Sequence, residues 1–112
     1  MPDVQIVLSQ PGPLPITATA DIETDGPVGL TLAGSVWSTT ANTMVGFSLY
    51  IDGEPLELGA AIYASTPNQH MAVVPIVVPY AFTVGTHTFS LQASNPQTAS
   101  DENDVFQVTA LS

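Results

Sequence analysis

His70 and His87 are the only side chains of this chain that titrate near neutral pH, because the sequence contains no cysteine. Neither histidine stands in a nucleophile motif such as GxSxG. His87 shares the strand parity of Phe89 and Leu91, so we expect it at the rim of the core, hydrogen-bonded to backbone. His70 lies where a polar loop enters an apolar run, which favours a loop or interface residue over a metal ligand. The two histidines therefore do not predict a catalytic site.

Carboxylates form three clusters that could bind a cation. The clusters are Asp21-x-Glu23-x-Asp25, Asp52-x-Glu54-x-x-Glu57 and Asp101-Glu102-Asn103-Asp104. Calcium takes about six to eight oxygen ligands, and Asp101, Asn103 and Asp104 could supply several, so these three are the candidate calcium ligands. No cluster matches the EF-hand loop. The alternative, which we favour, is that acidic residues at turns keep an apolar chain in solution.

The charge balance of the chain excludes several classes of function. The 112 residues include ten carboxylates and no lysine or arginine, which gives a formal net charge of −10, while 45% of residues are hydrophobic. Nucleic-acid binding is not expected, because phosphate contacts depend mainly on lysine and arginine. Paired carboxylates could in principle hydrolyse glycosides, but no basic residue is present to orient an anionic substrate. We therefore expect neither an enzyme nor a bound cofactor.

The elements that must position these residues are predicted to be β-strands throughout. Apolar and polar residues alternate in eight segments, and turn residues separate them roughly every ten residues. The segments are 4–8, 16–24, 28–38, 44–52, 55–64, 70–82, 87–93 and 105–111. The Asp52-Gly53 pair predicts a tight hairpin turn. The pattern indicates an all-β fold, an antiparallel β-sandwich, with a jelly roll as first choice and an immunoglobulin-like order as second.

The domain organisation is predicted from the same segments. Residues 1–15 form an N-terminal strand or arm that could dock elsewhere, and residues 16–112 form a single β-sandwich domain.

The run from Met71 to Phe82 is apolar at both strand parities and contains Pro75 and Pro79. Each proline removes a ladder donor, which argues for an edge strand. An edge strand with two apolar faces invites aggregation unless another chain covers it. We therefore predict a homo-oligomer that buries this run. The predicted interface residues are Met71, Val73, Val74, Ile76, Val77, Val78 and Tyr80.

Three segments carry a resemblance to a known group of proteins: 32–37, 46–53 and 84–89. Their sequences, Leu-Ala-Gly-Ser-Val-Trp, Gly-Phe-Ser-Leu-Tyr-Ile-Asp-Gly and Val-Gly-Thr-His-Thr-Phe, resemble small β-sandwich accessory proteins of bacteriophage virions. The last two also resemble jelly rolls of the tumour-necrosis-factor type, and this resemblance implies that a trimer is the favoured homo-oligomer. The resemblance implies a non-enzymatic structural protein, such as a capsid decoration, tail or fibre component, that docks onto other proteins of a particle.

The acidic run at 101–104 resembles the calcium loop of bacterial fucose-binding lectins, in which a similar run precedes the C-terminal strand. This chain ends in Leu111-Ser112 instead of the glycine that completes the lectin site, so sugar binding is not carried over. The alternative function that stays open is a calcium-dependent carbohydrate-binding module. Trp37 and Tyr63, and also Tyr50 or Tyr80, would be its stacking platforms.

No segment of the sequence resembles a targeting signal. No basic stretch precedes an apolar one, and no apolar run reaches the roughly 18 residues of a membrane span. We expect no signal peptide and no membrane insertion, and we expect assembly into a virion in a host cytoplasm.

Overall fold

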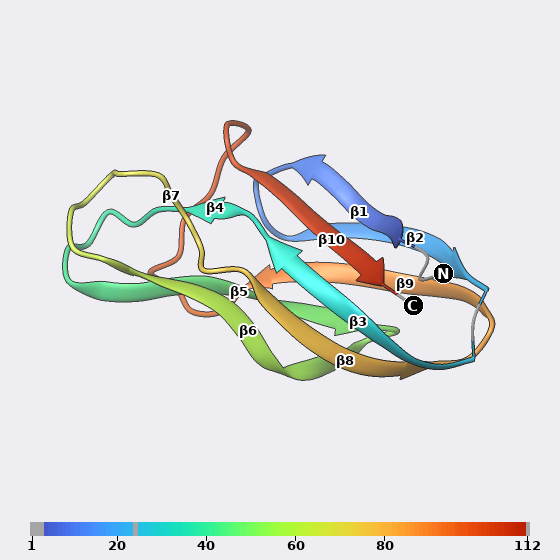
Figure 1. The fold of residues 1–112 in the computed structure, drawn as a ribbon. Helices are drawn as coiled ribbons and strands as arrows, with labels where there is room; N and C mark the ends of the chain where they lie inside the picture. The colour runs from blue at the N-terminus through green and yellow to red at the C-terminus, as the bar shows by residue number, and fades with distance from the viewer. Residues whose placement is uncertain (1–3, 24, 112) are drawn as a thin grey trace.

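A computed structural model describes residues 4–23 and 25–111, without the side chains of residues 57 and 58. Within these residues all regular elements are strands (Figure 1). The strands are β1 (Val4–Pro11), β2 (Ile16–Ile22), β3 (Gly26–Ala33), β4 (Ser35–Val36), β5 (Thr43–Ile51), β6 (Glu54–Ala64), β7 (Met71–Ala72), β8 (Ile76–Phe82), β9 (Gly85–Ala93) and β10 (Val105–Leu111). The all-β prediction is confirmed.

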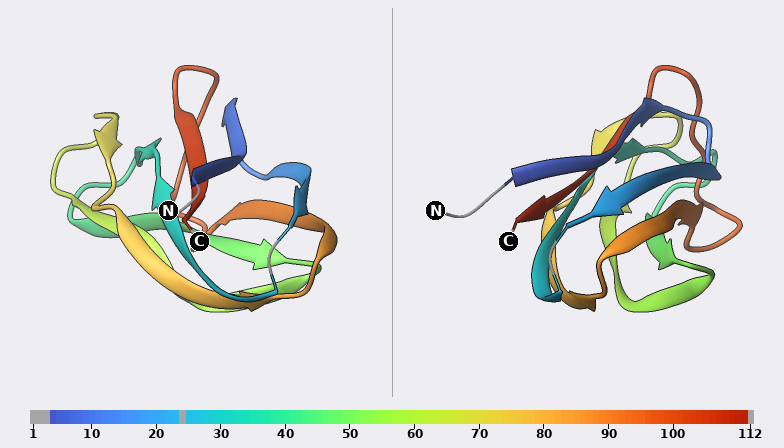
Figure 2. Two further views of the ribbon diagram at one scale, coloured as in Figure 1. Left: turned by 45° about the vertical axis from the view of Figure 1, so that its right-hand side comes forward. Right: turned by 90° about the vertical axis from the view of Figure 1, so that its right-hand side faces the viewer.

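Two four-stranded antiparallel sheets lie one over the other, in the orders β1-β10-β3-β8 and β2-β9-β5-β6 (Figure 2). We call them the first and the second sheet. The chain follows the path of one long hairpin that closes at β5–β6, with β3 beside β8, β2 beside β9 and β1 beside β10. Each step outward along this hairpin changes sheet. This is the strand order of a jelly roll, the first of the two predicted orders.

The core lies between the sheets because each strand turns alternate side chains inward. In β10, Phe106, Val108 and Ala110 are buried, while the residues between them face outward. The rings of Phe47 and Phe106 meet edge to face, with centroids 5.1 Å apart. Side chains from both sheets thus interdigitate, as the alternation in the sequence predicts.

The segment expected to be an N-terminal strand or arm is an edge strand in its described part. β1 pairs with β10 from Val4 opposite Leu111 to Pro11 opposite Val105. It also contributes the buried residues Val7 and Leu8 to the core. Within this chain, β1 is therefore part of the sandwich.

The apolar run from Met71 to Phe82 is not one strand. β7 pairs with β4 in a small separate sheet, residues 73–75 form a connection, and β8 is the edge strand beside β3. The edge position that the prolines indicated is confirmed. The connection allows Val73 to turn into the core while Val74 stays exposed.

Two predicted interface residues are placed differently from our expectation. Val73 and Val78 are 3% and 7% exposed and belong to the chain's own core. Met71, Ile76 and Tyr80 are half-buried and pack against that core. The prediction of an exposed interface was therefore wrong for Val73 and Val78. A strand that alternates must give one of its two apolar faces to its own sandwich.

Candidate functional site

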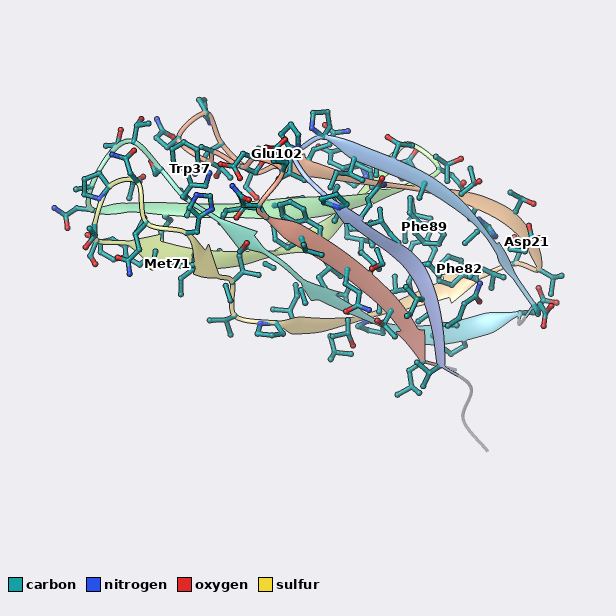
Figure 3. The ribbon with its side chains drawn as sticks, turned by 90° about the horizontal axis from the view of Figure 1, so that it is seen from above. Asp21, Trp37, Met71, Phe82, Phe89 and Glu102 are labelled. Carbon is teal, nitrogen blue, oxygen red and sulfur yellow. The ribbon has the colours of Figure 1, made fainter. Side chains whose placement is uncertain are left out.

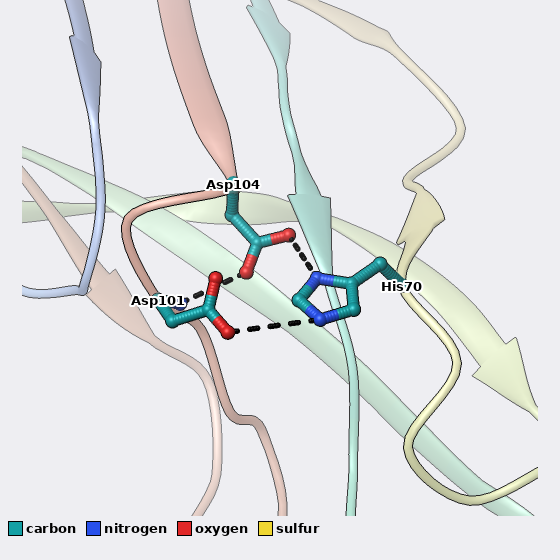
Figure 4. Close-up of side chains that lie close together, drawn as sticks. All are labelled: His70, Asp101 and Asp104. Carbon is teal, nitrogen blue, oxygen red and sulfur yellow. Dashed lines mark hydrogen bonds and ion pairs between the residues drawn. The ribbon is translucent and has the colours of Figure 1, made fainter.

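A histidine and two aspartates meet at one end of the sandwich (Figure 4). His70 precedes β7, whereas Asp101 and Asp104 lie in the loop between β9 and β10. His70 Nδ1 is 2.8 Å from Asp104 Oδ1, and His70 Nε2 is 3.7 Å from Asp101 Oδ2. Potential ligand atoms of the three residues lie within 4.8 Å of one another. We call this group the His70 cluster.

Asp104 is the anchor of the His70 cluster, and it is fully buried. The Ser35 hydroxyl donates to Asp104 Oδ1 at 2.6 Å, and the Asp101 backbone N–H donates to Oδ2 at 2.9 Å. The Gly12 N–H donates to the Asp104 backbone carbonyl at 2.7 Å. With His70, four chain segments converge on one residue. A buried carboxylate is tolerated only when hydrogen bonds replace water, and here the fold provides them.

The hydrogen bond to the Asp104 carboxylate raises the pKa of His70 above its usual 6.5. A carboxylate only accepts hydrogen bonds, so His70 carries a proton on Nδ1. Ser35 donates to Asp104 and not to the imidazole, so the histidine does not activate that hydroxyl. The arrangement is therefore an anchored histidine–aspartate hydrogen bond and not a nucleophilic triad.

The structure brings together two of the three predicted calcium ligands. Asn103 is exposed, and its backbone N–H donates to Asp101 Oδ1 at 2.9 Å. The third cluster member is His70, which offers nitrogen, whereas calcium prefers oxygen. Both oxygens of Asp104 already accept hydrogen bonds from protein donors. Calcium binding at Asp101, Asn103 and Asp104 thus stays a prediction.

Sequence reasoning missed His70 as a member of this cluster. It is 34 residues from Asp104, and no spacing in the sequence connects the two positions. They meet because β7 pairs with β4 beside the start of β10. Finding this contact requires knowledge of which strands pair in the folded chain.

A second histidine–aspartate pair joins the β5–β6 turn to β9. Asp52 and Gly53 have φ of 52° and 86°, as expected for the predicted tight turn with two left-handed residues. Asp52 Oδ1 accepts the Thr88 N–H at 2.9 Å, and Oδ2 lies 2.6 Å from His87 Nδ1. The other ring nitrogen of His87 lies 2.7 Å from the Thr83 carbonyl oxygen. The prediction of a rim histidine with a backbone partner is confirmed.

The Thr88 N–H, followed by His87, lowers the pKa of Asp52 below 3.8. Asp52, followed by the Thr83 carbonyl, raises the pKa of His87 above 6.5. Both shifts favour the charged forms of the two side chains.

The two predicted stacking residues differ in their accessibility. Trp37 is half-buried, its backbone pairs with Ala99, and its ring lies 5.3 Å from the ring of His70. Tyr63 is 50% exposed on the edge strand β6, and its hydroxyl donates to Asn42 Oδ1 at 3.3 Å. Tyr63 is therefore the more accessible of the two platforms. Calcium-dependent carbohydrate binding stays a prediction.

The outer face of the first sheet is a further candidate surface. The described strands β1, β10, β3 and β8 contain no aspartate, glutamate, histidine, lysine or arginine. Two rows of cross-strand neighbours run over this face: Val4, Leu111, Gly29 and Pro79, then Ile6, Thr109, Thr31 and Val77. Directly paired residues project to the same side of a sheet. We call these two rows the uncharged face.

Among the described residues no helix is long and apolar enough to cross a membrane.

Neither a family model nor a curated protein matches the sequence. The structure is similar to part of dimeric latent PorU from Porphyromonas gingivalis, with a TM-score of 0.58 and 9% identity over 98% of this chain and 12% of that one. Another similar structure is the CBM36-1 domain of a multidomain xylanase from the hindgut metagenome of Trinervitermes trinervoides. It gives a TM-score of 0.49 and 14% identity over 100% of this chain and 97% of that one. The likeness to PorU shows a shared β-sandwich fold, and this chain spans about an eighth of that protein.

Proposed function

We propose that this chain is a non-enzymatic assembly protein that acts by associating with copies of itself and by docking onto a larger particle. The observation that carries the proposal is the exposure of large apolar side chains on the first sheet. Val77 is 67% exposed on the edge strand β8, and Val4 is 68% exposed on the opposite edge strand β1. Apolar side chains gathered on one surface mark an interaction site more often than a solvated one.

The side-chain clusters support a structural function and not a catalytic one. In the His70 cluster the serine donates to the aspartate, and Asp104 is enclosed. In the other pair, His87 faces a carboxylate and a backbone carbonyl at hydrogen-bond distance. Both histidines thus connect loops to strands. Such connections stabilise a scaffold, and neither leaves an activated group for a substrate.

A virion is the particle that we propose, as a decoration, tail or fibre component. The support for this is the sequence resemblance of residues 32–37, 46–53 and 84–89 to virion accessory proteins. These segments fall in β3–β4, β5 with its turn, and the start of β9. A jelly roll with an apolar outer face suits a subunit of a particle, because neighbouring subunits would bury that face and hold the subunit in position.

Sedimentation velocity over a range of micromolar concentrations tests self-association directly. We expect wild-type protein to sediment faster than an 11.6-kDa monomer. The fraction of the faster species should increase as the protein concentration rises. Adding salt should favour association, because it screens the repulsion between chains of charge −10. A monomer at all concentrations and salt levels would refute self-association as the function of the free chain.

A further inference from the structure

We infer that two copies of this chain pair through the uncharged face of the first sheet, related by a twofold axis. The inference rests on the proposed self-association and names the surface responsible for it. It differs from our sequence prediction, which placed the interface on the run from Met71 to Phe82 alone. Of that run, only the outward side of β8 takes part, together with β1, β10 and β3.

The composition of the first sheet is the primary observation. Its four strands contain no aspartate, glutamate, histidine, lysine or arginine, although the whole chain carries ten carboxylates. Large apolar residues nevertheless stand on its outer side. Val4, Ile6, Val77, Val105 and Leu111 are 48–68% exposed there. The second sheet, by contrast, carries Asp21 and Glu54 on its edge strands. Acidic residues are thus absent from the strands of the first sheet and are not distributed evenly over the molecule.

Charge determines which partner fits this face. The chain has no lysine or arginine, and both histidines already face aspartates of their own chain. Two copies therefore have no lysine or arginine with which to offset a carboxylate. An interface on any acidic part of the surface would bring like charges together, or would desolvate a carboxylate without a partner, at a cost of several kcal/mol per ion. Pairing the uncharged face with itself avoids both penalties. A second copy is therefore the occupant that the charge distribution favours.

The same argument favours a twofold dimer over the trimer expected from the jelly-roll resemblance. A cyclic trimer joins two different patches of the surface. One of them would lie outside the uncharged face, where acidic residues stand on turns and edge strands. A twofold contact uses one patch twice, so each copy presents only uncharged groups.

The shape and size of the face suit a contact between sheets. On this face its two central strands present the small residues Gly29, Thr31 and Thr109 together with Leu111. Four strands about 4.8 Å apart and about 25 Å long cover roughly 500 Å² per copy. Two copies would bury about 1,000 Å², near the lower end of specific interfaces. We therefore expect an association in the micromolar range.

The test places one charge on each edge of the uncharged face and an equal charge elsewhere. Val77→Glu and Ile6→Glu alter exposed residues of β8 and β1, and Val84→Glu alters a 58%-exposed valine in the β8–β9 turn. All three change an aliphatic side chain to glutamate on the surface. Wild type and Val84→Glu should sediment as dimers with about equal dissociation constants. Val77→Glu and Ile6→Glu should weaken the dimer at least tenfold while keeping the circular dichroism spectrum of a folded sandwich.

The possible results separate this inference from the proposed function. A wild-type monomer would overturn both. A wild-type oligomer that survives Val77→Glu and Ile6→Glu would overturn the inference and leave self-association standing. Equal weakening by Val84→Glu would show a general effect of charge, and a wild-type trimer would exclude twofold pairing, so either result would also overturn it. If one edge variant unfolds, the other decides the outcome.

Discussion

The two histidine–aspartate pairs lie toward opposite ends of the sandwich. In one pair the aspartate is the more buried partner, and in the other the histidine is. Trp37, which contacts His70, and Asp21, which lies on β2 beside β9, mark these two ends in Figure 3. In the His70 cluster the Asp104 carboxylate is 0% exposed and the imidazole is 39% exposed. In the other pair the Asp52 carboxylate is 48% exposed and the His87 imidazole is 12% exposed. The same two residue types thus form an anchored carboxylate at one end and an anchored imidazole at the other.

The difference shows that the buried partner determines how each pair responds to change. Water cannot take over the hydrogen bonds of Asp104, because this carboxylate lies in the interior and accepts hydrogen bonds from Ser35 and Asp101 as well as His70. Water can take over part of the hydrogen bonding of Asp52, because this carboxylate lies in an exposed turn. The position of the proton matters more at His87, where both ring nitrogens face acceptors. We expect substitutions of the aspartates and changes of pH to rank the two ends in opposite orders.

Asp104→Asn should give the largest effect, a loss of about 3 kcal/mol in the free energy of unfolding. The amide of asparagine presents one oxygen and one NH₂ group, so donors at one of the two carboxylate oxygens lose their acceptor. Glu102→Gln, an exposed acid in the same loop, is the matched control and should change stability by under about 0.5 kcal/mol. Urea denaturation measures both variants. Equal effects would show that Asp104 is not an anchor.

Asp52→Asn should cost less, about 1 kcal/mol, because its hydrogen bonds to Thr88 and His87 lie in a solvated turn. The backbone bond from the Asp52 N–H to the Thr88 carbonyl, at 2.8 Å, should remain. The measurement is again urea denaturation, with Glu54→Gln in the same hairpin as control. A loss as large as that of Asp104→Asn would contradict the ranking by burial of the carboxylate.

The fold could be predicted from the sequence because its signals are local. Alternation predicts which side of β10 is buried, and Asp52-Gly53 predicts the hairpin turn. The prolines of the run from Met71 to Phe82 predict an edge position. What could not be predicted is the break of that run at residues 73–75, because it depends on pairing between β4 and β7. Pairing of distant segments leaves no periodic signal in the sequence.

The candidate sites were harder to predict because they depend on contacts between segments. The sequence indicated that Asp101 and Asp104 lie together, since they are three residues apart. It did not indicate that Asp104 is buried or that His70 lies beside it. The uncharged face was likewise hidden, since its residues come from four strands that are interleaved only by the jelly-roll order. The absence of charge from each strand is visible in the sequence, but which strands are neighbours is not.

The response to pH should be the smallest effect, and it should reverse the ranking of the two pairs. Both histidines have a pKa above 6.5 in the folded chain. Their protonation therefore stabilises the fold fully below about pH 6.5, and this contribution is lost as the pH rises through the folded pKa values. On this account the melting temperature should fall between pH 6 and pH 9.

His87 should account for more of that fall than His70. A neutral imidazole has one N–H, so deprotonated His87 must direct a lone pair at the Asp52 oxygen, 2.6 Å away, or at the Thr83 carbonyl oxygen, 2.7 Å away. Neutral His70 can keep its Nδ1–H on Asp104 and loses only the longer approach of 3.7 Å to Asp101. Melting curves of His87→Gln and His70→Gln, recorded beside wild type at each pH, isolate the two contributions from the titration of the remaining groups. The wild-type fall should shrink more in His87→Gln, and a larger reduction in His70→Gln would reverse our assignment of the proton-sensitive end.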